Sequence, residues 1–126
     1  MDILNMFNEG RIVLGSKEIV VNQLPWNEHP TFSGVALKHL ITGKDTDYKF
    51  SSHIVRIKAG CEIGNHIHEG KWELHEVIQG SGKCIISDQQ ISYSAGTIAT
   101  IPADIPHRVQ ANEDLYLLAK FVPALL

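Results

Sequence analysis

The sequence has little cysteine and no excess of basic charge. Only two cysteines occur, Cys61 and Cys84, and they form neither a CxxC pair nor a zinc-finger spacing. We expect two reduced, partly buried thiols, as in a cytoplasmic protein, and the sequence leaves a disulfide between them open. Eleven Lys and Arg residues against 14 Asp and Glu residues give a net charge of −3. This balance provides no surface that attracts nucleic acid or an anionic membrane.

Long apolar runs are also missing. No stretch approaches the roughly 18 apolar residues of a membrane span. The first residues, MDILNMFNEGR, lack the basic and apolar regions of a signal peptide. We therefore expect a soluble cytoplasmic protein with no membrane partner and no nucleic-acid partner. Its 126 residues fit one domain, and 44% hydrophobic residues are enough for a packed core.

Sustained helical periodicity is absent, and short alternating segments take its place. These predicted strands cover residues 35–42, 49–58, 72–79, 83–87, 96–101, 107–110 and 115–122. Turn-forming residues such as those at 80–82 and 102–104 separate them. Many short strands with hairpin-length turns predict an all-β sandwich or barrel. Residues 1–30 are interpreted as an arm that packs on the barrel or on a partner subunit, with the barrel in residues 31–126.

The spacing of histidines points to a metal site. His66 and His68 are two residues apart, so on an extended strand their side chains point to the same face. Glu73 and His75 share one face of the next predicted strand. Imidazoles and a carboxylate around one volume, with coordination positions left open, suit Fe, Mn, Zn, Ni or Co without choosing among them. An isolated HxH pair is more often two ordinary histidines, and Glu69 is a rival carboxylate that points away if the strand continues.

Two longer motifs surround these residues. From Gly60 to Gly80 the sequence GCEIGNHIHEGKWELHEVIQG follows the pattern G-x5-H-x-H-x4-E-x6-G. From Gly96 the sequence GTIATIPADIPHRVQA follows G-x5-P-x-G-x2-H-x3-N, with Asp104 in place of glycine and Ala111 in place of asparagine. The chain thereby resembles the cupin superfamily over about residues 35 to 122. Aspartate tolerates a left-handed backbone, so we expect the turn to survive. The loss of asparagine puts the hydrogen bonding at that strand end in doubt.

The resemblance implies a jelly-roll β-barrel that holds one divalent metal ion through His66, His68, Glu73 and His107, and it implies a homodimer. It transfers no substrate, because cupins include dioxygenases, isomerases, decarboxylases, lyases, storage proteins and regulatory domains. We favour a metal-dependent enzyme acting on a small organic molecule, with dioxygenase-like oxidative cleavage first and isomerase or lyase chemistry next. The alternative is a non-catalytic module that binds or senses a small ligand. A metal-stabilised structural protein is a third hypothesis.

Two further histidines are expected to face inward. His75 lies beside Glu73, either as a core histidine bonded to a neighbour or as a group that orients a ligand or acts as a general base. His53 shares a face with Val55 and Ile57. We predict that His75 and His53 are the catalytic proton carriers.

The sequence places three other polar residues outside these patterns. His29 lies in a proline-rich loop, where we expect it to be solvated or at a subunit contact. Arg56 and Lys120 would bind an acidic substrate if they faced inward, but their neighbours do not fix their direction.

Overall fold

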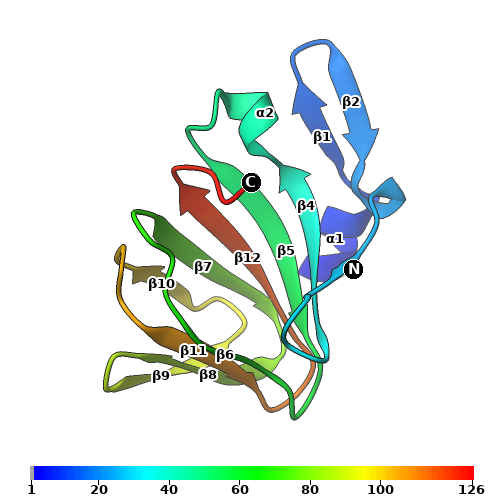
Figure 1. The fold of residues 1–126 in the computed structure, drawn as a ribbon. Helices are drawn as coiled ribbons and strands as arrows, with labels where there is room; N and C mark the ends of the chain where they lie inside the picture. Colours follow the sequence, from blue (N-terminus) through cyan, green and yellow to red (C-terminus); the bar gives the residue numbers. More distant parts are fainter. Residues whose placement is uncertain (1) are drawn as a thin grey trace.

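Two antiparallel sheets form the main body of the computed structural model, which describes residues 2–126 (Figure 1). The larger sheet has six strands, in the spatial order β10 (Ile98–Ile101), β7 (Trp72–Gln79), β12 (Leu115–Val122), β5 (Ser51–Ile57), β4 (Val35–Ile41) and β3 (Asn27–Glu28). The smaller sheet has four, in the order β6 (Glu62–His66), β11 (His107–Ala111), β8 (Ser81–Ile86) and β9 (Gln89–Ser94). The sheets face each other, which confirms the predicted all-β jelly-roll barrel.

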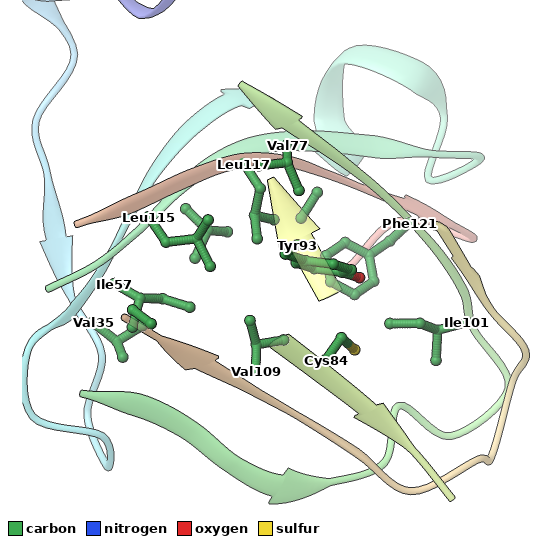
Figure 2. Close-up of a cluster of buried hydrophobic side chains, with 13 residues drawn as sticks. Val35, Ile57, Val77, Cys84, Tyr93, Ile101, Val109, Leu115, Leu117 and Phe121 are labelled. Carbon is green, nitrogen blue, oxygen red and sulfur yellow. The ribbon is translucent and has the colours of Figure 1, made fainter. Parts of the chain in front are cut away.

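The alternation along each strand decides which side chains enter the core. Val55 on β5 and Val77 on β7 both lie opposite Leu117 of β12, so all three point to the same side of the larger sheet. They belong to a buried cluster between the two sheets, to which Tyr93 contributes from the smaller sheet (Figure 2). Glu73 continues the inward row of β7 and is buried. The same alternation therefore points polar side chains of β7 into the interior of the barrel.

The segment before the barrel is folded against the outer face of the larger sheet. It contains the helix α1 (Ile3–Glu9), a hairpin of β1 (Arg11–Leu14) and β2 (Lys17–Val20), and the 3-10 turn η1 (Val21–Gln23). Its buried side chains form a second cluster with outward residues of the sheet, and this cluster contains Leu4, Ile12, Val21, Ile54, Ile78 and Leu118. Met1 lies outside the described residues, and the division of the chain at residue 30 stays a prediction.

Helices are few, as the sequence pattern indicates. Sequence periodicity did not predict α1, which begins where the Asp2 side chain accepts a hydrogen bond from the Asn5 backbone N–H at 2.8 Å. A second short helix, α2 (Gly43–Thr46), joins β4 to β5. Within residues 2–126, none of the helices has the length and apolar character needed to cross a membrane.

Candidate metal centre

Strand pairing brings two of the predicted ligands together. His66 ends β6, His107 begins β11, and the two residues lie opposite each other in the antiparallel pair. His68 follows two residues later, with its Nε2 atom 3.1 Å from Nε2 of His66. The candidate ligand atoms of these three histidines all lie within 4.8 Å of one another. The three histidines are thus positioned so that they could hold a metal ion.

Backbone carbonyls determine which nitrogen of two of these rings carries the proton. His66 Nδ1 lies 2.7 Å from the Gly64 carbonyl oxygen, and His107 Nδ1 lies 3.0 Å from the Ile105 carbonyl oxygen. A carbonyl only accepts a hydrogen bond, so each Nδ1 must donate and each neutral ring keeps a lone pair on Nε2. The Nε2 atoms converge on one volume, where their lone pairs repel unless a cation lies between them. The donor set therefore fits a divalent ion with imidazole ligands.

Glu73 reaches this cluster from the other sheet. Its Oε1 atom lies 3.1 Å from Nε2 of His107 and 3.6 Å from Nε2 of His68. The carboxylate is buried, and within residues 2–126 its side-chain partners are all histidines. A buried carboxylate needs a positive partner, so its position suits the fourth ligand that the cupin resemblance predicts. Its coordination of an ion stays a prediction.

His75 holds the second oxygen of this carboxylate. Its Nε2 donates to Glu73 Oε2 at 2.6 Å, and its Nδ1 lies 2.8 Å from the hydroxyl of Tyr93. Burial disfavours charge on both groups, but their mutual attraction is stronger. It raises the pKa of His75 to about 9 and holds the pKa of Glu73 well below its usual range. The His75 contact leaves Oε1 turned toward His68 and His107.

His53 lies in a different part of the interior. It is fully buried, with its Nδ1 atom 2.8 Å from Nδ1 of His39 and its Nε2 atom 2.9 Å from Ser51 Oγ. The ring of Phe121 packs edge-on against both His53 and His68. Among the described residues, the Phe121 ring thus lies against both His53 and, in the metal cluster, His68. The sequence pattern did not predict its pairing with His39, which depends on the register between β4 and β5.

The buried His53 predicts a pH dependence of folding stability. Burial first, and then the nearby His39, lower its pKa from 6.5 to about 4, while Glu73 opposes the shift. Between these pH values the unfolded chain binds a proton that the folded chain does not, so stability falls as the pH falls. The shift corresponds to about 3 kcal/mol of unfolding free energy.

We expect His53→Gln to reduce the acid sensitivity of the metal-free protein by up to this amount. His68, whose pKa burial also lowers to about 4, should retain its own contribution. Urea unfolding of both proteins at pH 7 and about pH 4 measures it. An equal loss of stability in the variant and the wild type would contradict this assignment.

A small cavity opens beside the metal cluster. Its volume is about 150 Å³, and its lining consists of His29, Leu37, Val55, Ile63, His66, His68, Glu73, Ala119, Phe121 and Leu125. A neighbouring hollow of about 300 Å³ shares His29, Leu37 and Leu125 with it and also contacts His39. His29 is half-buried at this lining, and its expected solvation or subunit contact stays a prediction.

The two basic residues considered as binders of an acidic substrate are not part of this lining. The Arg56 guanidinium lies over the Trp26 ring, 4.6 Å from its centre, and Lys120 pairs with Glu76. Both stand on outward positions of the larger sheet. The cavity thus draws its polar character from histidines and Glu73.

Comparison with known families identifies the family of the chain. A family model described as a cupin domain matches residues 53–119, which is more than half of the chain. The chain belongs to the cupin family. A comparison with curated proteins finds no significant sequence match.

Solved structures share the cupin fold at low sequence identity. A predicted oxalate decarboxylase from Thermotoga maritima is 19% identical, with a TM-score of 0.74, and the match covers 82% of this chain and 96% of that one. KdgF from Halomonas sp. is also 19% identical, with a TM-score of 0.72 and coverages of 81% and 88%. Ectoine synthase from P. lautus is 22% identical, with a TM-score of 0.67 and coverages of 73% and 66%. At these identities the likeness establishes the fold alone.

This cupin tolerates both departures from the second motif. Asp104 adopts the left-handed backbone that glycine favours, with φ of 67°. Its Oδ1 accepts a hydrogen bond from the Gly70 N–H at 2.9 Å, which ties the turn to the loop after His68. At Ala111 the backbone itself forms the hydrogen bonds, with its N–H donating to Cys61 and its carbonyl accepting from Gly60, each at 3.0 Å. The strand end is therefore hydrogen-bonded without asparagine.

Substitution of Asp104 should measurably change the unfolding free energy of this cupin. Asp104→Ala removes the acceptor for Gly70 and places alanine at positive φ, so we expect a loss of about 1–3 kcal/mol of unfolding free energy. Asp104→Asn keeps an acceptor oxygen and tolerates the same backbone, so it should stay within about 0.5 kcal/mol of the wild type. Thermal unfolding of the three proteins tests this, and equal losses in the two variants would contradict the role of the side chain.

Proposed function

We propose that this cupin is a metal-dependent enzyme that acts on a small organic substrate. Dioxygenase-like oxidative cleavage is the favoured reaction, and isomerase or lyase chemistry comes next. The observation that carries the proposal is the convergence of histidine Nε2 lone pairs at the edge of a small apolar cavity. His66, His68, Glu73 and His107 would hold one divalent ion, with Fe, Mn, Zn, Ni and Co as candidates. When bound, such an ion supplies Lewis acidity and, if it is redox-active, oxygen chemistry.

The surrounding residues would orient the ligands and move protons. His75 fixes the Glu73 carboxylate and holds a proton on Nε2, 2.6 Å from Oε2, with Tyr93 at the far nitrogen. This makes His75 the better supported of the two proposed proton carriers. His53 would act through His39, which contacts the neighbouring hollow. The apolar lining would keep water away from the reacting atoms. Several similar structures bear the names of enzymes, among them a decarboxylase and a synthase.

The alternative is a non-catalytic module that binds or senses a small ligand with the same cavity. Oxygen uptake distinguishes the two. We expect the Fe(II)-loaded protein to consume O2 with one class among catechols, diketones and thiols, and the His107→Ala protein to consume none. Turnover without O2 uptake would instead support isomerase or lyase chemistry. Saturable ligand binding without any turnover would support the sensing module. An ion that raises the unfolding temperature while no ligand ever does would support a structural role.

We further propose a homodimer in the cytoplasm. Exposed apolar side chains on α1 and on the β1–β2 hairpin support a subunit contact, and they are Ile3, Met6, Phe7, Val13 and Val20. The hairpin projects from the barrel (Figure 1). Both cysteines are free, as in a reducing compartment.

The proposed dimer contact predicts the effect of a charge in the hairpin. Val13→Glu would place a carboxylate in an apolar interface and should yield a monomer. Lys17→Glu on the same hairpin serves as the control and should leave the dimer intact. Light scattering coupled to size-exclusion chromatography measures both, and a monomeric wild type would contradict the proposal.

A further inference from the structure

His29 has the opposite protonation pattern to the histidines of the metal cluster. Its Nδ1 atom accepts hydrogen bonds from the backbone N–H groups of Thr31, at 3.0 Å, and Phe32, at 3.2 Å. A backbone amide only donates, so Nδ1 carries a lone pair and the proton of the neutral ring must lie on Nε2. Backbone carbonyls thus leave His66 and His107 with a lone pair on Nε2 that can bind a cation. Backbone amides leave His29 with an Nε2–H group that can donate a hydrogen bond.

The loop holds the His29 ring in a fixed position. The ring stacks on Phe32 with the two centres 4.7 Å apart, and Phe32 in turn faces His66 at 6.3 Å. Gly64 makes room for this packing, because a Cβ atom there would lie 2.8 Å from the Phe32 ring. Among residues 2–126, no side chain or backbone group forms a hydrogen bond to His29 Nε2. The ring therefore offers an unused N–H group while it lines the metal cavity.

The rest of the lining limits what the cavity can bind. Six of its residues are apolar, and they are Leu37, Val55, Ile63, Ala119, Phe121 and Leu125. No lysine or arginine belongs to the described lining. A second anionic group, or several hydroxyls, would lose water there without gaining a partner. The ion can bind one oxygen-bearing group of a ligand. The rest of that ligand must be short and apolar to fit a volume of about 150 Å³.

We propose that His29 is a substrate-binding residue, which donates a hydrogen bond from Nε2 to an oxygen of a small ligand with one oxygen-bearing head and a short apolar body. The inference rests on the proposed metal function, because the head group would meet the ion and His29 together. It assigns a role to a loop residue outside both sequence motifs. It also predicts that the cavity binds dicarboxylates and sugars more weakly than a ligand with a single oxygen-bearing group.

Two four-carbon acids test the ligand class. We would load the protein with Co(II), whose visible absorption reports its ligands, and titrate it with butanoate and with succinate, which differ by the second carboxylate. We expect a saturable spectral change with butanoate, and at least about tenfold weaker binding of succinate. Equal affinities, or no response to butanoate in a protein that holds cobalt, would overturn the ligand class. A wild-type protein that binds no cobalt would instead contradict the proposed metal function.

Two substitutions test His29 itself. His29→Ala should leave the cobalt stoichiometry unchanged and weaken butanoate binding about tenfold or more, the usual effect of losing a hydrogen bond to a charged group. His29→Asn distinguishes ligand binding by His29 from the hydrogen bonds through which His29 stabilises its loop. Its side-chain oxygen can accept from Thr31 and Phe32, whereas its shorter side chain withdraws the donor from the cavity. We expect His29→Asn to unfold at the wild-type temperature and still bind butanoate weakly. Wild-type butanoate affinity in either variant would overturn the role of His29.

Discussion

Replacing His107 by alanine is expected to abolish stoichiometric binding of a divalent ion while the barrel stays folded. His107 is almost fully buried, and its Nε2 lies 3.1 Å from Glu73 Oε1, between the two sheets. Loss of a group that merely orients a ligand costs about 10- to 100-fold in metal affinity, so loss of a direct ligand should exceed about 100-fold. Elemental analysis of the dialysed protein gives the ratio of metal to chain directly.

His39→Ala is the matched control for this experiment. It also removes an imidazole, here a partly buried one, but His39 is not part of the cavity that contains the metal cluster. We expect one ion per chain in His39→Ala and none in His107→Ala, with similar circular dichroism spectra for both. Equal occupancy in the two variants would contradict the assignment of His107 as a ligand.

Gly80→Ala is expected to prevent stable folding. Gly80 joins β7 to β8 with φ of +90°, and a Cβ atom there would lie 2.0 Å from the backbone oxygen of Asp114. The backbone at Asp114 leads into β12, at the centre of the larger sheet, and cannot move without shifting that strand. Strain and overlap together should cost more than about 4 kcal/mol. Typical domains have about 5–15 kcal/mol of stability in total.

Gly96→Ala introduces backbone strain without steric overlap. Comparing it with Gly80→Ala therefore gives the contribution of the overlap. Gly96 begins the second motif and has φ of +96°, but a Cβ atom there would meet nothing within 4 Å. We expect it to cost about 1–3 kcal/mol and to unfold cooperatively at a reduced temperature. Circular dichroism at increasing temperature compares the variants. A Gly80→Ala protein as stable as Gly96→Ala would show that the turn near Asp114 adapts.

Alternation along the strands predicted much of the fold. Val55 and Ile57 were expected on one face, and the structure places both in the inner cluster, while Ile54 between them lies in the outer cluster. Glu73 and His75 were expected to share a face, and both are buried on the inner side of β7. A two-residue period needs only local information, because successive side chains of a strand point to opposite faces whatever its partner is.

Other elements escaped sequence reasoning because their patterns are weak. The strand β9 carries only Ile91 and Tyr93 as apolar residues within QQISYS, so its alternation is easily read as a loop. The hairpin β1–β2 lies in the predicted arm, where the sequence pattern predicted no strand of its own. Its Ile12 is buried only because the outer face of the larger sheet lies beside it. Tertiary packing, rather than propensity, stabilises such short segments.

The sequence by itself determined which residues could gather around an ion, since the spacing of His66, His68, Glu73 and His107 follows a family motif and the strand period. It could not determine what each ring does. Carbonyls leave His66 and His107 with lone pairs on Nε2 at the metal cluster, whereas amides in a remote loop leave His29 with a donor N–H at the same cavity. Those partners depend on the backbone path of turns and on contacts between the distant segments at Phe32 and Gly64. Hydrogen-bond direction is therefore a property of the folded chain, and it distinguishes histidines that the sequence alone treats alike.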